Sequence, residues 1–278
     1  MIRIGARAHD FGTLSSDELS ATMAGHGLSC AQLALNKAIS GLNLKRGDLN
    51  PGLAWAIGQA FQRNNVQIAV LGCYINPIHP DEGPRSELLG FFKDHLRIVR
   101  DLGGSVVGLE TGTPNADYAP DPNTGSEATF QSLLRSIGEL VRAAESLGGL
   151  VAVEAVTHHT ISTPAKMKRL LDEIQSENLV VIHDPVNLIN ADNHEDQARM
   201  IEEPFQLYGD RIAIIHAKDF TMKDGACRQV PTGFGELDYA RLCSLLAKHK
   251  PGISILLEES GPDTVAHCLS HIQKHWPS

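Results

Sequence analysis

Four side chains able to bind metals or move protons stand at the ends of four apolar runs in the second half of the sequence. They are Glu154 in LVAVEAV, Asp184 in LVVIHDPVN, His216 in IAIIHAKDF and Glu258 in ISILLEES. Short runs rich in valine, isoleucine and leucine are typical of buried strands. A charged group there must pair, bind an ion or stay in water, because burying it alone is too costly. Three carboxylates with an imidazole suit Mn²⁺, Mg²⁺, Co²⁺ or Zn²⁺.

Each of these residues also has a purely structural explanation. The Asp184 carboxylate is placed to cap the segment that follows it, and a single histidine at a strand end, such as His216, is usually an ordinary hydrogen-bonded side chain. Glu258 and Glu259 are adjacent, and strand alternation in the sequence does not choose between them. The four positions lie 30, 32 and 42 residues apart, on consecutive predicted strands. This coincidence favours one shared metal site over four unrelated charges.

The elements that must position these residues alternate along the whole chain. Alternating strands and helices favour a parallel sheet, and eight such units in about 250 residues match the size of a (β/α)₈ barrel. We therefore expect a TIM barrel that occupies residues 1–278 as a single domain. An open doubly wound sheet is the alternative, but no GxGxxG motif follows the first strand. The predicted strands are 2–7, 30–36, 66–73, 105–111, 150–156, 179–185, 212–218 and 253–259, and the predicted helices include 51–64, 84–102, 129–147, 162–174, 239–249 and 263–275.

Composition excludes several classes of partner. The formal net charge is −9 and there is no long basic run, which opposes nucleic-acid binding. No apolar stretch approaches the roughly 20 residues that span a bilayer, and the first residues do not resemble a signal peptide. The five cysteines are scattered without a CxxC pair, as in reduced cytoplasmic proteins. We expect a cytoplasmic protein that acts on a small molecule, with no membrane or nucleic-acid partner.

Other polar residues follow the predicted strands, at the barrel end where active sites lie. His9 follows the first strand, Glu110 ends the fourth, and His158 and His159 come after Glu154. Lys218 stands two residues after His216. For each of them a solvated loop position is the alternative to substrate contact.

The segments VAVEAVTHH, VIHDPVNL, IIHAKDF, VPTGFGELDY and ILLEES, together with GCYINPIHPD and GLETGT, cover nearly the whole chain. They resemble the sugar phosphate isomerase/epimerase family of xylose isomerase-like TIM barrels, whose members include tagatose/psicose 3-epimerases, hydroxypyruvate isomerases, inosose dehydratases and endonuclease IV. The resemblance implies that Glu154, Asp184, His216 and Glu258 bind a divalent metal and that the two glutamates also move protons. The epimerases place a substrate-binding histidine where this sequence has Asn187, so the resemblance implies that Asn187 contacts the substrate in its place, as we also expect of His9, Glu110, His159 and Lys218.

The resemblance implies an enzyme of carbohydrate metabolism: a metal-dependent isomerase or epimerase acting on a sugar, sugar phosphate or keto-polyol. A divalent cation can stabilise an enediolate, and a carboxylate can remove the adjacent carbon-bound proton. The alternatives are a metal-dependent dehydratase of an inosose- or dehydroshikimate-like ring, an endonuclease IV-like phosphodiesterase, which the −9 charge disfavours, and a non-catalytic sugar-binding barrel. The resemblance also implies a homodimer or homotetramer.

Overall fold

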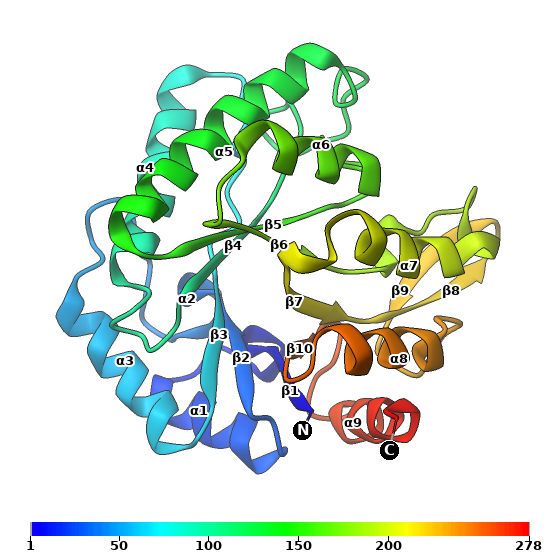
Figure 1. The fold of residues 1–278 in the computed structure, drawn as a ribbon. Coiled ribbons are helices and arrows are strands. Elements are labelled where there is room, and N and C mark those ends of the chain that lie inside the picture. The colour runs from blue at the N-terminus through cyan, green and yellow to red at the C-terminus, as the bar shows by residue number, and fades with distance from the viewer. Residues whose placement is uncertain (1, 278) are drawn as a thin grey trace.

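Eight parallel strands close into a barrel in the computed structural model, which describes residues 2–277. Figure 1 shows these strands at the centre of the molecule. Each predicted strand is confirmed, although most of them end earlier than predicted. The second strand ends at Leu33 because residues Leu35–Ala38 turn into the short helix α2. Around the barrel the order is β1 (Arg3–Arg7), β10 (Ser254–Leu257), β7 (Ile212–Ala217), β6 (Leu179–His183), β5 (Leu150–Glu154), β4 (Val106–Glu110), β3 (Gln67–Gly72) and β2 (Cys30–Leu33).

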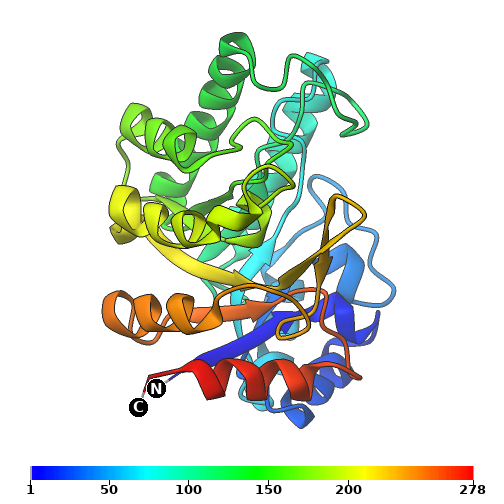
Figure 2. The same cartoon turned by 90° about the vertical axis from the view of Figure 1, so that its right-hand side faces the viewer.

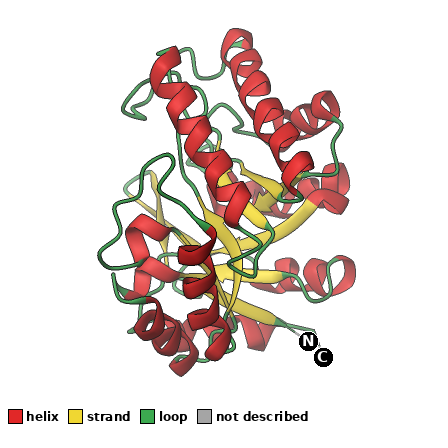
Figure 3. Cartoon of the chain, turned by 90° about the vertical axis from the view of Figure 1, so that its left-hand side faces the viewer, coloured by secondary structure: helices red, strands yellow, loops and turns green. Residues whose placement is uncertain are grey.

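Helices lie outside the strands and cover them (Figures 1 and 3). Their starts carry the expected capping groups: Ser126 accepts a hydrogen bond from the Thr129 amide at the start of α5, and Asp238 accepts one from the Arg241 amide at the start of α8. Within residues 2–277, no helix combines the length and the apolar character needed to cross a membrane. The longer helices are α1 (Ser16–Gly25), α3 (Pro51–Arg63), α4 (Glu82–Ile98), α5 (Glu127–Leu147), α6 (Pro164–Ile174), α7 (Gln197–Tyr208), α8 (Tyr239–His249) and α9 (Val265–His275).

A two-stranded hairpin, which was not predicted from the sequence, separates β7 from α8. Its strands, β8 (Asp219–Lys223) and β9 (Ala226–Val230), pair antiparallel and stand beside the barrel (Figure 2). The turn is Asp224–Gly225, with φ values of 53° and 73°, the pairing that two-residue hairpin turns favour. Asp219 anchors the base, since its carboxylate accepts hydrogen bonds from the amides of Phe220, Gly233 and Leu237.

Side-chain alternation along the strands decides which residues face the barrel axis. Ala152, Ile182, Ile214 and Leu256 belong to one buried cluster, which is distinct from the larger core between the strands and the helices. Side chains two residues apart on a strand face the same way. Residues 154, 184, 216 and 258 each come two positions after one of these four residues, at the carboxyl ends of the strands. Their side chains therefore also face the barrel axis.

His183 faces the helices instead, because it lies between two inward-facing positions. Its ring meets Phe205 of α7 edge to face, with 5.8 Å between the ring centroids. Burial lowers the pKa of His183 to about 3. The folded chain therefore keeps this imidazole neutral at pH values where the unfolded chain protonates it.

This difference should make folding stability pH-dependent. Below the ordinary histidine pKa of about 6.5, the unfolded chain binds a proton that the folded chain does not. The free energy of unfolding therefore decreases as the pH is lowered. Between pH 7 and pH 5 the free energy of unfolding of the parent chain should decrease, and that of His183→Phe should decrease by about 2 kcal/mol less. Urea denaturation at the two pH values measures this. His249→Phe is the control, since His249 is exposed yet also lies beside Phe205. Equal pH dependence in the parent chain and His183→Phe would contradict the assignment.

Candidate metal centre

The four strand-end side chains converge at the carboxyl ends of the barrel strands. Glu154 is the last residue of β5, His216 lies near the end of β7, and Asp184 and Glu258 directly follow β6 and β10. One potential ligand atom of each lies within 4.8 Å of those of the others, and all four side chains are buried. The structure thus brings together the set of residues that the sequence analysis selected.

The spacing of these atoms fits a single ion. His216 Nδ1 lies 3.0 Å from Glu154 Oε1 and 3.3 Å from Glu258 Oε1. Two donors bound at right angles to one ion, each at about 2.1 Å, are separated by about 3 Å. Asp184 Oδ2 is buried and makes no hydrogen bond within residues 2–277, although the Lys218 ammonium lies 2.9 Å away. A bound ion would provide this oxygen with a second positively charged partner. The residues present therefore fit a divalent metal.

Lys218 is a buried cation in direct contact with this cluster. Its ammonium donates a hydrogen bond of 2.7 Å to Glu258 Oε2 and lies 2.9 Å from Asp184 Oδ2. Burial alone would lower the pKa of Lys218, but the carboxylates of Asp184 and Glu258 outweigh burial and raise it. Burial likewise opposes protonation of His216, yet Glu154 and Glu258 raise its pKa to about 9. Both groups partly neutralise the buried carboxylates.

Glu258, rather than Glu259, belongs to the cluster. Burial would raise the pKa of Glu258, but His216, Lys218 and Arg7 together lower it to about 2. The Glu259 side chain is 42% exposed and forms an ion pair of 3.0 Å with Arg7. Its backbone φ of 53° is left-handed, so the alternation of the strand has ended by this residue.

The loop after β6 holds two of the acidic groups in place. Asp184 Oδ1 accepts hydrogen bonds from the backbone amides of Val186 and Asn187, at 2.9 and 3.2 Å. The Asn187 side chain donates to Glu154 Oε1 at 2.8 Å and accepts from Gln229 of the hairpin at 3.1 Å. Asp184 thus combines the capping role weighed for it with a place in the cluster. Asn187 contacts a predicted ligand directly.

A cavity of about 220 Å³ lies beside the cluster and reaches it at Glu258. The predicted residues His9, Glu110, Asn187 and Lys218 all line it, whereas His159 does not and its neighbour His158 does. The remaining lining residues are Arg7, Gln32, Lys37, Tyr74, Val156, Gln229 and Glu258.

Two predicted substrate-contacting groups have shifted pKa values. Burial, with the nearby carboxylates of Glu154 and Glu258, raises the pKa of Glu110 to about 7. Burial, with the positive charges of Arg7 and Lys37, lowers the pKa of His9 to about 4. Near neutral pH, His9 is therefore a neutral hydrogen-bonding group. His159 Nδ1 lies 3.5 Å from a carboxylate oxygen of Glu110, and its ring packs against that of His158. His159 therefore contacts two residues of the cavity wall without lining the cavity itself.

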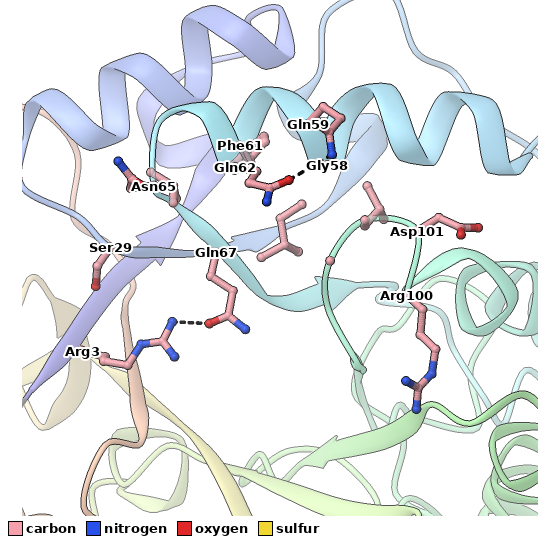
Figure 4. A pocket seen from close by; sticks show the side chains of 14 residues that line it. Arg3, Ser29, Gly58, Gln59, Phe61, Gln62, Asn65, Gln67, Arg100 and Asp101 are labelled. Carbon is pink, nitrogen blue, oxygen red and sulfur yellow. Dashed lines mark hydrogen bonds between the residues drawn. The ribbon is translucent and has the colours of Figure 1, made fainter.

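A larger hollow of about 670 Å³ lies at the opposite ends of the first strands. Figure 4 shows Arg3, Ser29 and Gln67 on one side of it and Arg100 with Asp101 on another. Arg3 is already hydrogen-bonded to Gln67, and Arg100 donates to the carbonyl of Gly148 at 2.8 Å. None of the four cluster residues lines this hollow. Active sites of such barrels lie at the carboxyl ends of the strands, and we place the site there.

The sequence analysis did not select Arg7, Gln32, Lys37 or Gln229. Arg7 and Gln32 lie in strands, and the sequence alone does not show whether their side chains point toward the barrel axis or toward the helices. Lys37 lies in the short helix α2, directly after the segment 30–36 that was predicted as a strand. Gln229 enters through the hairpin, and the Asp224–Gly225 pair was the signal that could have revealed it.

Comparisons with known proteins agree with this architecture. A family model described as xylose isomerase-like TIM barrel matches residues 17–275. No curated protein matches the sequence. Among solved structures, the 3-keto-D-glucoside 4-epimerase YcjR from E. coli superposes with a TM-score of 0.74 at 15% identity, covering 99% of this chain and 100% of that one.

Two further solved structures resemble the chain. The probable 3-DHS dehydratase AsbF from Bacillus anthracis has a TM-score of 0.75 at 12% identity, covering 98% of this chain and 99% of that chain. The IolI protein, solved with a zinc atom, has a TM-score of 0.71 at 17% identity, covering 99% and 96%. Likeness at such identities shows the fold alone. The family match, which covers most of the sequence, shows that the chain belongs to the xylose isomerase-like TIM barrels.

Proposed function

We propose that this chain is a divalent-metal-dependent isomerase or epimerase of a sugar, sugar phosphate or keto-polyol. The observation that carries the proposal is the buried cluster of Glu154, Asp184, His216 and Glu258 beside a polar cavity. Structural neighbours with epimerase names support the same class of chemistry.

The four cluster residues would hold the ion, which is Mn²⁺, Mg²⁺, Co²⁺ or Zn²⁺ by the chemistry of the donors. When bound, the ion supplies Lewis-acid polarisation of a substrate carbonyl. The zinc atom in the solved IolI structure supports an ion in this type of barrel. The neutral His9 and the other polar groups of the cavity wall would bind the hydroxyl groups of the substrate.

Glu154 is the best-placed base. Its Oε1 is held by Asn187 and lies beside His216 Nδ1, while its Oε2 makes no hydrogen bond within residues 2–277. That oxygen is available to remove a proton from the carbon next to a carbonyl. Glu258 directly follows β10, and Glu154 ends β5. The strands β7 and β6 lie between β10 and β5 in the barrel. Lys218 donates a hydrogen bond to Glu258 Oε2 and would supply the proton that Glu258 passes on. Transfer of this proton to the same carbon gives epimerisation, and transfer to the neighbouring carbon gives isomerisation.

Dehydration is the second candidate, and Lys218 favours it. Its ammonium lines the cavity and already holds Glu258 Oε2, so this oxygen is less available to take a proton. Glu154 would remove the carbon-bound proton while Lys218 donates a proton to the departing hydroxyl, which leaves as water. The fold likeness to the probable dehydratase AsbF supports this alternative.

Proton exchange in heavy water tests the proposal. The chelated protein, reloaded with Mn²⁺, should incorporate solvent deuterium into at least one member of a panel of keto sugars and cyclic ketones. Mass spectrometry separates the outcomes, because an isomer gains deuterium while a dehydrated product loses the mass of water. The metal-free protein should show neither. Turnover that survives complete removal of the metal, or no exchange with any compound by the metal-loaded protein, would contradict the proposal.

Glu154→Gln should slow deuterium exchange by about 10²- to 10⁴-fold, because the amide cannot accept the proton. Calorimetry of Mn²⁺ binding to the variant separates the loss of the base from the loss of the ion. Glu259→Gln is the matched control, because Glu259 lies outside the cluster, and it should retain the parent rate. Equal rates in Glu154→Gln and Glu259→Gln would remove Glu154 from the mechanism.

Asn187→Leu should separate a role in positioning Glu154 from contact with the substrate. If Asn187 orients the base, kcat falls about 10- to 100-fold and KM stays within about threefold. Steady-state kinetics on the compound found by deuterium exchange measure both constants. A raised KM with unchanged kcat would instead make Asn187 a substrate-binding residue, as predicted from the sequence.

A further inference from the structure

A second hollow of about 380 Å³ lies beside the mouth of the candidate site. Its walls are the loop at residues 156–158, the loop at residues 186–191, and strand β9 of the hairpin. It shares Val156, His158, Asn187 and Gln229 with the cavity beside the cluster. The two spaces are therefore neighbours across a common wall, and the hydrogen bond from Gln229 to Asn187 belongs to that wall.

The hairpin presents one of its faces to this side hollow. Cys227 and Gln229 both line it, whereas Arg228 between them does not. Their cross-strand partners, Met222 and Phe220, are likewise two residues apart, as strand alternation requires. The hairpin thus adds a wall that the eight-strand barrel alone would lack.

The side hollow differs from the mouth in its charge. Among residues 2–277, no aspartate, glutamate, lysine or arginine lines the side hollow, whereas the cavity beside the cluster is lined by Arg7, Lys37, Glu110, Lys218 and Glu258. An ionic group such as a phosphate would find no opposite charge in the side hollow. An uncharged ligand is the better match.

Polar groups in the side hollow remain available for hydrogen bonds. The Thr157 hydroxyl, the Asn190 side-chain nitrogen and Gln229 Oε1 make none within residues 2–277, although Asn190 Oδ1 accepts from the amides of Asp192 and Asn193. Val186 and Ile189 add apolar surface. Neutral donors and acceptors beside apolar side chains suit the hydroxyls and carbon-bound hydrogens of a sugar ring.

We propose that the side hollow is a second subsite, which binds an uncharged, hydroxyl-bearing ring joined to the sugar that reacts over the metal cluster. The substrate is then a glycoside or disaccharide. The nature of the reacting half rests on the proposed function, but binding of the uncharged half does not.

The isolated uncharged half provides a direct test. We would titrate methyl α-D-glucoside to about 50 mM. This concentration exceeds the millimolar Kd that is typical of a ligand held by a few hydrogen bonds. Backbone amide NMR signals of Thr157, Ala191 and Cys227 should shift and saturate. Cys227→Trp, which fills the hollow, should weaken binding at least about tenfold. Arg228→Trp, on the other face of the hairpin, should bind as the parent does.

Ala191→Phe fills the same hollow from the opposite wall, which keeps the test valid if Cys227→Trp does not fold. Absence of saturable shifts, or binding unchanged in both filling variants, would overturn the subsite. Tighter binding of glucose 6-phosphate at the same amides would overturn its neutral character. Because this assay needs neither a metal nor turnover, its result is independent of the deuterium-exchange test. Positive binding without any exchange would contradict the proposed reaction and leave the subsite standing.

Discussion

The attraction between buried carboxylates and the buried cations beside them is the interaction on which the candidate site depends. Glu154, Asp184 and Glu258 are withdrawn from water within a few ångströms of one another, an arrangement that repels itself unless positive charge is supplied. Lys218 and His216 supply part of it, with ion-pair distances of 2.7–3.3 Å. A divalent ion bound by the same four side chains would supply the rest and would take the place of the proton that His216 otherwise carries.

The barrel is what makes such a cluster possible. Side chains along each strand point alternately toward the barrel axis and away from it. Those that point inward are apolar within the barrel, and the next inward-pointing residue, two positions further on, is polar or charged and lies at the carboxyl end of the barrel. The loops fix the orientation of those groups through Asn187 and the backbone amides that bind Asp184. The hairpin after β7 extends the mouth sideways and contributes Gln229.

The sequence was sufficient for the barrel and for Glu154, Asp184 and His216, because apolar runs ending in a polar or charged group are visible without coordinates. It was not sufficient to choose Glu258 over Glu259, since that choice depends on Leu256 facing the axis. Arg7, Lys37 and Gln229 were missed because their relation to the mouth is tertiary. The contact of Asn187 with Glu154 was hidden for the same reason. Glu154 ends β5, whereas Asn187 lies in the loop after the neighbouring strand β6, 33 positions further along the chain.

We propose that these four side chains together hold one divalent ion. Anomalous scattering from a crystal of the protein soaked in Mn²⁺ would locate this ion. We expect one strong peak within about 2.0–2.6 Å of donor atoms of Glu154, Asp184, His216 and Glu258. A peak at a different set of side chains, or no peak at this cluster under saturating Mn²⁺, would contradict it.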